Sequence, residues 1–591
     1  SEQVEHSLTA GRHLLLAAPT GLGKTAAVLH AALRWAHERG GRVFFATART
    51  TQQRMAELAL SRMAQRGLRL RAVSLRARDK VCLNEVVSCR PEDCRYAAGY
   101  HDKVTGGELQ ERAWSEAGCM DPVRIVDLGQ QADACPYALS MELAHNADVV
   151  VGDYNYLFDP RVRLRSLLDE AHQWAIIVDE AHNLPQRAMG YGSPRLDRAL
   201  PQAALESLGP DETMLPFARL AHDVSAWIDA GLEDVGLNEN QTGEMALPLD
   251  LLDQRGLQAL VQRADARALD YALLQARRSR LPPGTTDPYV ELCRALHSLR
   301  SALDSAGDET VALFRRGRDD RGGLSLLCRD PSGLLGPILN SAAGTICMSA
   351  TLQPPGFYGD LLGLRRDRTE EHQHPSPFEP SHLRVLVLPQ VSTAYRHRSR
   401  DQAATAAWIS RTVRTIPGNV AIYAPSFDFL EQLADQLKIE DRELIRQTRQ
   451  VDEQRRAEIL ERMKAPSRRP AVLLAVLGGI FAEGIDLPGE ALLAAIIIGP
   501  GLPPVGLERR LLTEWYEQRY GRGSLYASLV PGLCRVVQAA GRVIRTPTDR
   551  GAIVLVGKRF QQYEISDLMP SDWTPRTSRD PESDLAGLWS D

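Results

Sequence analysis

The sequence predicts an α/β protein with two parallel-sheet domains, the first of which carries large insertions. Residues 11–36 read as a short buried strand, a glycine-bearing loop and a helix, which is the start of a phosphate-binding parallel sheet. A second buried strand, at 175–178, runs directly into two adjacent carboxylates. Between 419 and 503 apolar strands alternate with helical stretches, which predicts a second parallel sheet with helices on its faces.

Length and composition limit the alternatives. At 591 residues the chain exceeds what a single hydrophobic core supports, and we expect about three or four domains. The net charge of −5 gives no global electrostatic reason to bind nucleic acid, so any such binding must come from local grooves. No signal peptide and no apolar run of about 20 residues is visible, and we therefore expect a cytoplasmic protein whose thiols stay reduced.

The loop at 18–25 has the residues of a phosphate-binding loop. Gly21 and Gly23 allow backbone N–H groups to close around phosphate oxygens, at the positive end of the following helix. Lys24 would reach the terminal phosphates and Thr25 would ligate Mg²⁺. Ala18 replaces the first glycine of the usual pattern, which the turn tolerates because it depends most on Gly21 and Gly23.

The strand at 175–178 delivers Asp179 and Glu180 to the carboxyl edge of a parallel sheet, where open α/β sheets bind their ligands. Asp179 would hold Mg²⁺, usually through water, and Glu180 would act as the general base on the attacking water. Alone, the D-E-A-H tetrapeptide is also compatible with a solvated helix start. Together with the phosphate-binding loop it predicts nucleotide hydrolysis.

The order of several motifs resembles superfamily-two helicases, and most closely the XPD/DinG group of DNA helicases. The resemblance is carried by D-E-A-H at 179–182, M-S-A-T-L at 348–352 and Q-A-A-G-R-V-I-R at 538–545. Further matching segments lie at 43–53, 150–160, 376–378, 423–430 and 481–489. The resemblance implies two RecA-like motor domains, ATP and Mg²⁺ as cofactors, and a DEAH-box hydrolase that moves on DNA.

The same resemblance implies the domain boundaries and further site residues. The first motor domain would comprise 1–72, 143–195 and 334–355, with an iron–sulfur lobe at 73–142, a helical arch at 196–333 and the second motor domain at 356–591. Gly484 and Asp486 would contact the nucleotide. His182, Ser349 and Thr351 would couple hydrolysis to movement. In these relatives a glutamine upstream of the phosphate-binding loop grips adenine, and Gln3 is too close to the loop to serve.

Residues 534–545 fit a helix that projects Gln538, Arg542 and Arg545 towards the nucleotide. An arginine over the γ-phosphate stabilises charge in the transition state. Because these arginines belong to the second motor domain, hydrolysis would depend on closure of the two domains.

Five cysteines crowd the first insertion: Cys82, Cys89, Cys94, Cys119 and Cys135. Their gaps are not the paired C-x₂₋₄-C spacings of most zinc sites, so they suit a centre gathered by tertiary folding, with zinc or plain reduced thiols as alternatives. The resemblance selects Cys82, Cys94, Cys119 and Cys135 as ligands of a 4Fe-4S cluster and leaves Cys89 without a counterpart. Metal ligation would stiffen a lobe that is too small to hold itself rigid, so that it can act as a wedge.

The second insertion contains one clear helix. Asp287 is its N-cap, Pro288 its first residue, and Leu292, Leu296, Leu299 and Leu303 form one apolar stripe, which indicates core packing. A translocating motor binds its strand through backbone contacts and stacking rather than sequence. The candidates for strand binding are Arg49, Thr50, Gln53, Arg95, Tyr96, Tyr154 and Asn155.

The sequence thus predicts a monomeric, ATP-dependent DNA helicase of DNA repair or replication, moving 5′ to 3′ on single-stranded DNA and 5′-tailed duplexes. An RNA-directed ATPase or a translocase that does not unwind is the first alternative. A catalytically silent DNA-binding scaffold is the second, but intact Lys24, Asp179, Glu180 and Arg542 argue against it.

Overall fold

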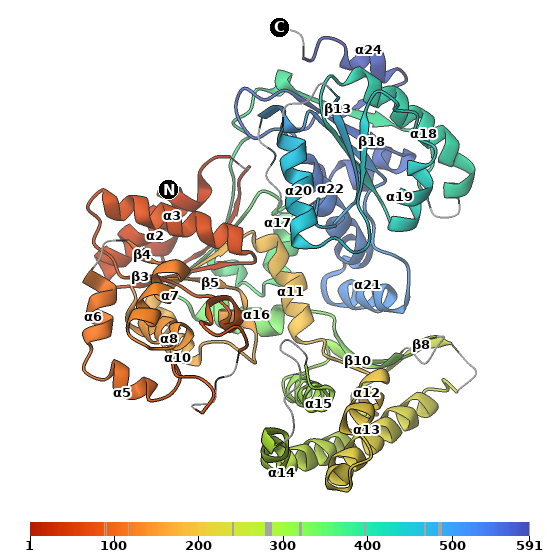
Figure 1. Cartoon of the computed structure of the whole chain (residues 1–591). Coiled ribbons are helices and arrows are strands. Elements are labelled where there is room, and N and C mark those ends of the chain that lie inside the picture. The colour runs from red at the N-terminus through yellow and green to blue at the C-terminus, as the bar shows by residue number, and fades with distance from the viewer. Residues whose placement is uncertain are drawn as a thin grey trace. The chain divides into compact units, whose positions relative to one another are not determined.

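A computed structural model describes residues 1–589 except for 20, 88, 90–91, 116–117, 239–241, 278–285, 318–321, 395–396, 466–468, 483–486 and 488. The chain divides into two compact units (Figure 1): one holds residues 1–15, 25–348 and 358–370, and the other holds 16–24, 349–357 and 371–591. The phosphate-binding loop therefore belongs to the second unit although it stands near the start of the sequence. None of the described helices combines the length and the apolar character that crossing a membrane requires.

The first sheet, which we call sheet A, has eight strands in the order β12-β1-β11-β6-β2-β5-β3-β4. The pairs β11–β6, β6–β2, β2–β5, β5–β3 and β3–β4 are all parallel. Its strands are β1 His13–Ala17, β2 Arg42–Thr47, β3 Ala72–Ser74, β4 Cys119–Met120, β5 Val149–Asp153, β6 Trp174–Asp179, β11 Gly344–Ser349 and β12 Thr369–Gln373.

Helices fill the connections between these strands. Around sheet A the helices outside the large insertion are α1 Glu2–Thr9, α2 Lys24–Arg39, α3 Thr50–Gln65, α4 Arg78–Val81, α5 Tyr100–Val104, α6 Glu108–Ser115, α7 Pro122–Gln131, α8 Pro136–Asn146, α9 Asn155–Phe158, α10 Arg165–Asp169, α11 Leu184–Tyr191, α16 Ser332–Ser341 and α17 Pro355–Leu361. The strand, loop and helix predicted at 11–36 are thus confirmed as β1 and α2.

The sequence predicted a helical insertion at 196–333. In the structure the insertion spans 195–328 and contains a β-sheet as well as helices. It contains α12 Ala199–Leu208, α13 Leu215–Asp234, α14 Gln254–Arg277 and α15 Pro288–Asp304. Four strands form an antiparallel sheet in the order β7-β10-β9-β8, with bounds β7 Arg195–Asp197, β8 Gly243–Leu247, β9 Thr310–Arg316 and β10 Gly322–Cys328. This sheet joins segments far apart in the sequence, which local propensity does not reveal.

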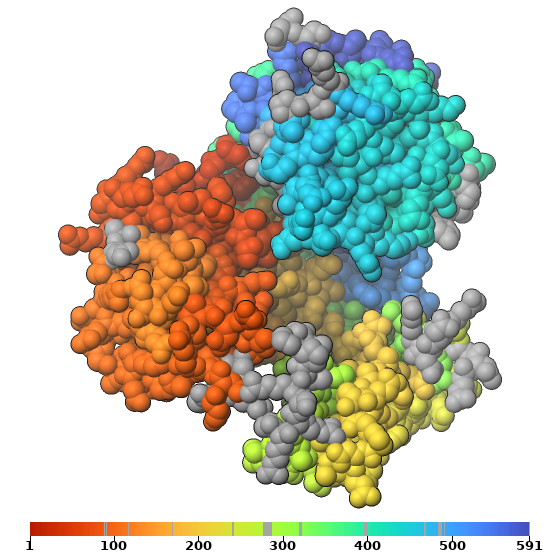
Figure 2. Space-filling view, in the orientation of Figure 1, coloured from red at the N-terminus to blue at the C-terminus, as the bar shows by residue number. Residues whose placement is uncertain are grey.

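The insertion has its own core, and its yellow-green atoms pack together as one body in the space-filling view (Figure 2). Helix α15 begins as predicted, because the Asp287 side chain accepts hydrogen bonds from the amides of Tyr289 and Val290. The leucine stripe of α15 is buried: Leu292, Leu296, Leu299 and Leu303. Each such side chain stabilises the fold by about 1.5–3 kcal/mol, so the stripe serves packing and not binding.

The second sheet, sheet C, has seven strands in the order β15-β16-β14-β17-β18-β13-β19, and every pair in it is parallel. The strands are β13 Leu383–Leu388, β14 Val420–Ala424, β15 Glu443–Arg446, β16 Ala471–Val476, β17 Ala494–Ile498, β18 Gly551–Val556 and β19 Arg576–Thr577. The helices are α18 Arg398–Thr415, α19 Phe427–Ala434, α20 Glu453–Lys464, α21 Leu507–Tyr520, α22 Val530–Ala540, α23 Tyr563–Ser566 and α24 Pro581–Leu585. The predicted second parallel sheet is therefore confirmed.

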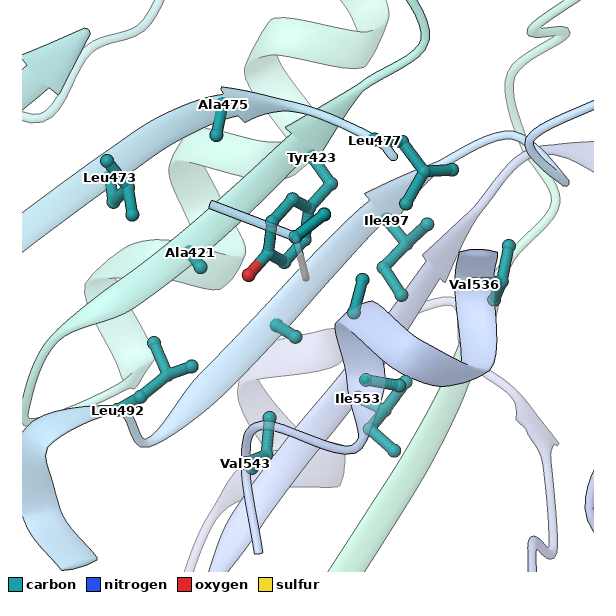
Figure 3. Packing of buried hydrophobic residues seen from close by; sticks show 14 of the residues in the cluster. Ala421, Tyr423, Leu473, Ala475, Leu477, Leu492, Ile497, Val536, Val543 and Ile553 are labelled. Atoms are coloured by element: carbon teal, nitrogen blue, oxygen red, sulfur yellow. The ribbon is translucent and has the colours of Figure 1, made fainter. Parts of the chain in front are cut away.

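Both faces of sheet C are buried under helices (Figure 1). Ala421 and Tyr423 of β14 pack in one apolar cluster with α20 and α22, which Figure 3 shows from close by. The intervening Ile422 packs in a second cluster with α18 and α19 on the other face. Because side chains alternate along a strand, a strand buried on both faces is apolar throughout, which is why these strands stood out in the sequence.

Candidate active site

The phosphate-binding loop follows β1 as predicted. Gly21 and Gly23 have φ angles of +88° and +70°, in the left-handed region that residues with a side chain disfavour. The Lys24 ammonium donates to the carbonyls of Ala18, over 2.7 Å, and Pro19, over 2.8 Å. Thr25 lies in the first turn of α2. The loop is thus a glycine turn at a helix N-terminus, the arrangement that binds phosphate.

The second unit also contains the loop that carries two predicted arginines. Helix α22 ends at Ala540 and is capped by Gly541, so Arg542 and Arg545 follow the helix rather than extend it. This corrects the predicted helix, and glycine's low helix propensity is the reason. A Cβ atom added to Gly21 would lie 2.7 Å from the Arg545 carbonyl oxygen, which brings this loop against the phosphate-binding loop.

Asp549 fixes the loop after α22. Its Oδ2 atom accepts from the amides of Arg545 and Thr546, both over 2.8 Å, and its Oδ1 accepts from the Thr546 hydroxyl over 2.5 Å. Sequence reasoning missed Asp549, although an Asp four residues after an arginine in a T-P-T-D turn is a typical turn-forming residue. Gln538 lies within α22 and is half-buried.

In the first unit, Asp179 ends β6 and Glu180 follows it, as predicted. The Asp179 residue is 7% exposed, and its Oδ1 accepts from the Glu180 amide over 3.0 Å. The Glu180 backbone has φ 50° and ψ 44°, a left-handed conformation that is uncommon outside glycine. Nδ1 of His182 lies 3.3 Å from Oε2 of Glu180, which makes His182 a neighbour of the proposed general base.

Ser349 and Thr351 lie together in the second unit. The two hydroxyl oxygens are 3.3 Å apart, and the thiol of Cys534 in α22 is 3.5 Å from the Thr351 hydroxyl. The Ser349 carbonyl accepts from the Ala18 amide over 2.9 Å, which joins the end of β11 to the phosphate-binding loop. This segment therefore touches both the loop and the helix that precedes Arg542. Gly484 and Asp486 lie outside the described residues.

A cavity of about 750 Å³ lies in the first insertion. Its lining includes Cys82, Cys89, Cys94 and Cys135, together with Tyr96 and Tyr100. Cys94 is buried, Cys82 and Cys135 are half-buried, and Cys89 is exposed. Four of the five clustered cysteines thus share one cavity, and Cys89 is one of them.

Cys119, which the resemblance places among the ligands, lies outside this cavity. It forms part of β4 at the edge of sheet A and is 1% exposed. Burial raises the pKa of the Cys119 thiol, an effect that the nearby Glu57 carboxylate reinforces. Cys119 does not line the cavity that the other four clustered cysteines share.

Two polar side chains in the lobe donate to cysteine sulfur atoms. Nη1 of Arg78 lies 3.4 Å from Sγ of Cys89, and the Arg78 guanidinium also lies over the Tyr137 ring at 4.8 Å. The side-chain amide of Asn84 donates to Sγ of Cys94 over 3.1 Å. The sequence could have indicated these two donors, because Arg78 and Asn84 both lie within four residues of Cys82.

The residues predicted to contact single-stranded DNA divide into exposed and buried ones. Thr50 is exposed, Arg49 is the N-cap residue of α3, and Arg95 has a 69% exposed side chain. Gln53, at 2% exposed, and Tyr96, at 8%, do not reach the surface, because Gln53 faces the core and Tyr96 lines the cysteine cavity.

Tyr154 was also predicted to contact single-stranded DNA, and the structure corrects this. Its side chain is fully buried, and its hydroxyl donates to the main-chain carbonyls of Asp179 and Glu180. It is therefore unable to stack on a base. Asn155 is half-buried, and its Oδ1 accepts from the Tyr191 hydroxyl over 2.6 Å.

Two family models match the chain. The DEAD_2 model matches residues 46–199, and the Helicase C-terminal domain model matches residues 409–576. The first range contains β5, β6 and the D-E-A-H residues, and the second contains most of sheet C and the loop of Arg542. Asp179, Glu180 and the loop of Arg542 thus fall within the matched ranges, whereas the phosphate-binding loop at 18–25 precedes the first of them.

Comparison along most of the chain gives distant helicase relatives. The chain is 23% identical over 592 residues to "Regulator of telomere elongation helicase 1 homolog" of Anopheles gambiae, covering 83% of this chain and 58% of that protein. It is 22% identical over 580 residues to "ATP-dependent DNA helicase chl1" of Schizosaccharomyces pombe, covering 85% of this chain and 68% of the relative. The chain thus spans little more than half the length of the Anopheles protein.

Solved structures share the fold along the whole chain. "XPD_Helicase" aligns with a TM-score of 0.69 at 18% identity, and "Structure of S. tokodaii Xpd4" with a TM-score of 0.61 at 16% identity. Each alignment covers 98% of both chains. With these matches the chain is related to helicases through its DEAD_2 and Helicase C-terminal domain regions, and it shares the fold of the XPD structures.

Proposed function

We propose that this chain is an ATP-dependent DNA helicase that moves 5′ to 3′ along single-stranded DNA in DNA repair or replication. The observation that supports the proposal most is the strand order of sheet A, in which β1, β11 and β6 are neighbours. The phosphate-binding loop follows β1, the carboxylates of Asp179 and Glu180 follow β6, and only β11 separates these strands. Parallel strands deliver such residues to one edge of a sheet.

Each residue of this site has a chemical task. Lys24 and the loop amides would bind the β- and γ-phosphates of ATP, and Thr25 and Asp179 would hold Mg²⁺. Glu180 would take the proton of the attacking water. Arg542 and Arg545 would stabilise the charge that develops on the γ-phosphate, and Gln538 would orient the water or phosphate. The contact of Gly21 with the Arg545 backbone supports this role for the loop after α22.

The choice of DNA rests on the names of the relatives, of which one is called an ATP-dependent DNA helicase. Arg49, Thr50, Arg95 and Asn155 are the proposed contacts to the strand backbone. Contacts of this kind bind any sequence, as a translocating motor requires. His182, Ser349 and Thr351 would pass the state of the nucleotide to the rest of the motor. His182 lies beside Glu180, Ser349 accepts from the phosphate-binding loop, and Thr351 contacts Ser349 and Cys534 of α22.

Among the described residues no three His, Cys, Asp or Glu side chains are gathered closely enough to hold a metal ion, but four cysteines line one cavity, and we propose that it takes a 4Fe-4S cluster. Such clusters are held by four cysteine thiolates, and Cys82, Cys89, Cys94 and Cys135 line one cavity that also receives hydrogen bonds from Arg78 and Asn84. We therefore replace Cys119 by Cys89 in the ligand set. When bound, the cluster would cross-link segments of a small lobe and supply folding free energy that its apolar core lacks. The stiffened lobe would act as a wedge between strands.

Two measurements test this function. ATP turnover is measured with no polynucleotide, with oligo(dT) and with oligo(U), and unwinding is measured on duplexes with a 5′ or a 3′ tail. We expect oligo(dT) to stimulate turnover most and only the 5′-tailed duplex to be unwound. Stronger stimulation by oligo(U) would favour an RNA-directed ATPase, stimulation without unwinding a pure translocase, and no turnover a silent scaffold.

A further inference from the structure

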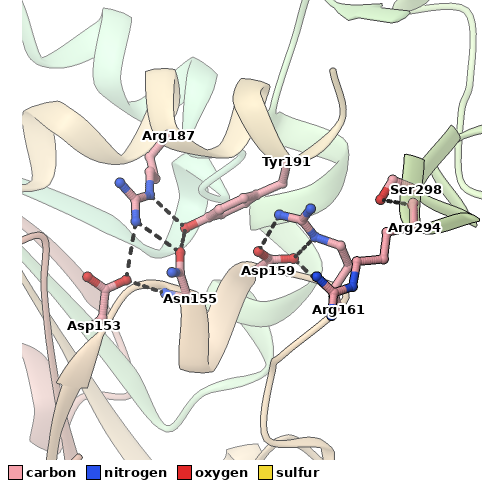
Figure 4. Close-up of polar contacts among 8 residues, drawn as sticks. All are labelled: Asp153, Asn155, Asp159, Arg161, Arg187, Tyr191, Arg294 and Ser298. Atoms are coloured by element: carbon pink, nitrogen blue, oxygen red, sulfur yellow. Dashed lines mark hydrogen bonds and ion pairs between the residues drawn. The ribbon is translucent and has the colours of Figure 1, made fainter. Parts of the chain in front are cut away.

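Three consecutive residues at the end of β5, Asp153, Tyr154 and Asn155, fasten the segment that begins with the D-E-A-H carboxylates. Asp153 forms an ion pair with Arg187 of α11 at 3.6 Å. Asn155 Oδ1 accepts from the Tyr191 hydroxyl over 2.6 Å and from Arg187 Nη2 over 3.2 Å (Figure 4). Tyr154, between them, donates to the carbonyls of Asp179 and Glu180. The tripeptide 153–155 therefore holds both ends of the segment 179–191.

The contact of Tyr154 falls where the backbone is strained. Glu180 is one of only two non-glycine residues with a positive φ in the described part of the chain, the other being Asp133. Such a conformation persists only where surrounding contacts determine it, and it is concentrated at functional sites. The Tyr154 hydroxyl, whose one proton is shared between the successive carbonyl oxygens of Asp179 and Glu180 and which lies 3.0 Å from that of Glu180, is such a contact.

Tyr154 is well suited to hold this position. Its ring is fully buried and meets the Phe158 ring edge to face, with centroids 6.3 Å apart. Burial raises the pKa of Tyr154 far above the ordinary tyrosine value, so its hydroxyl stays protonated and donates at every working pH. Meanwhile Nδ1 of His182 lies 3.3 Å from Oε2 of the Glu180 carboxylate. One residue thus fixes the backbone of the general base and another contacts its carboxylate.

The residues beside Tyr154 reach towards solvent. The Arg187 side chain is 46% exposed, and Asn155 and Tyr191 are half-buried. Arg161, close to them in sequence, is 58% exposed and paired with Asp159 at 2.9 Å. The Arg187 guanidinium, which bonds oxygen atoms of Asp153 and Asn155, is the kind of group that donates hydrogen bonds to a phosphate of bound DNA. A phosphate bound at this cluster would therefore pull on the same tripeptide that holds Glu180.

We propose that Tyr154 is a positioning residue for ATP hydrolysis, and that the tripeptide 153–155 links the backbone of Asp179 and Glu180 to the bound strand at Asn155 and Arg187. This inference rests on the proposed function and deepens it. The link needs no movement of an entire domain, because three adjacent residues span both contacts.

The test compares Tyr154→Phe with wild type at zero and at saturating oligo(dT). Loss of the hydroxyl should lower kcat at saturating strand by at least about tenfold, as misplaced catalytic groups do, while the KM for ATP stays within about twofold. The stimulation ratio, kcat with strand over kcat without, should fall at least about threefold. Tyr271→Phe is the matched control, because it also removes a tyrosine hydroxyl that donates to a neighbour, the Asp287 carboxylate at 2.7 Å in the insertion.

A kcat of Tyr154→Phe within about twofold of wild type would overturn the positioning role, as would an equal loss in Tyr271→Phe. A reduced kcat with an unchanged stimulation ratio would overturn the link to the strand. If Tyr154→Phe does not fold, Tyr191→Phe tests the link from its other end: a lower stimulation ratio supports it and an unchanged one refutes it. A wild-type protein that no polynucleotide stimulates would instead refute the proposed function itself.

Discussion

Nδ1 of His182 lies 3.3 Å from Oε2 of Glu180, and the histidine side chain is 7% exposed against 26% for the glutamate. A buried neighbour therefore limits the rotamers of a carboxylate that still meets solvent. This is the arrangement expected of a general base that must face one water molecule.

Glu180→Gln should abolish hydrolysis without abolishing nucleotide binding. The amide has the shape of the carboxylate but does not take up a proton, so we expect kcat to fall by about 10²–10⁴-fold. Binding of a fluorescent ATP analogue should remain, because Lys24 and the loop are unchanged. Glu291→Gln on the exposed face of α15 is the control, and normal turnover by Glu180→Gln would remove Glu180 from the mechanism.

The exchange of Cys119 for Cys89 in the ligand set is tested by metal content. Cys89→Ser should lose iron and acid-labile sulfide when purified anaerobically, because a cluster without its fourth thiolate is held poorly. Cys119→Ala should retain both, since Cys119 lies in β4 outside the cavity. Visible absorbance and iron analysis give the readout, and the opposite pattern would restore Cys119 as the ligand.

The strand-separating role of the lobe is tested with the same variant. We expect Cys89→Ser to keep strand-stimulated ATP turnover and lose unwinding of the 5′-tailed duplex, because the lobe stands apart from the hydrolytic residues in sequence and in sheet order. Normal unwinding by the iron-free protein would contradict the wedge.

Asp549 offers a test of the loop that carries Arg545. Asp549→Ala removes the acceptor of the Arg545 and Thr546 amides, and we expect kcat to fall by about tenfold as the loop loosens. Asp549→Asn keeps one carbonyl oxygen as an acceptor and should lose much less. Equal activity of the two variants would show that these hydrogen bonds do not position Arg545.

His13 predicts a pH dependence of stability. It is fully buried in β1, and burial, aided by the nearby Arg368, lowers its pKa from 6.5 to about 4. Below pH 6.5 the unfolded chain binds a proton that the native protein does not, so the free energy of unfolding falls as the pH drops towards 4. Between pH 7 and pH 5 this amounts to about 2 kcal/mol. Urea unfolding at both pH values should show a smaller loss for His13→Leu, and an equal loss would exclude His13 as the cause.

The parts of the fold that could be predicted are those with a local cause. The glycines after β1, the Asp287 cap of α15 and the apolar strands of sheet C each carry their reason within a few residues. The helix predicted through Arg542 failed for a local reason too, since Gly541 ends α22.

What could not be predicted depends on partners distant in the sequence. The strand β7 pairs with β10 across more than a hundred residues, and neither shows which surface it will meet. Cys89 and Cys119 look alike as thiols, and only the fold assigns one to the cavity and the other to sheet A. The hydroxyl of Tyr154 reaches Glu180 because β5 and β6 both flank β2, which no spacing in the sequence expresses.

The insertion at 195–328 begins with β7 and ends with β10, and these strands are hydrogen-bonded neighbours with Leu196 opposite Leu324. The amide of Leu326 also donates to the Pro194 carbonyl over 3.0 Å. The points where the chain enters and leaves the insertion are thus hydrogen-bonded neighbours. A short turn could join them in place of the insertion at little cost in loop-closure entropy. The insertion therefore has the geometry of a cassette. Evolution or an engineer can remove it, enlarge it or transfer it to another motor without changing the strand order of sheet A.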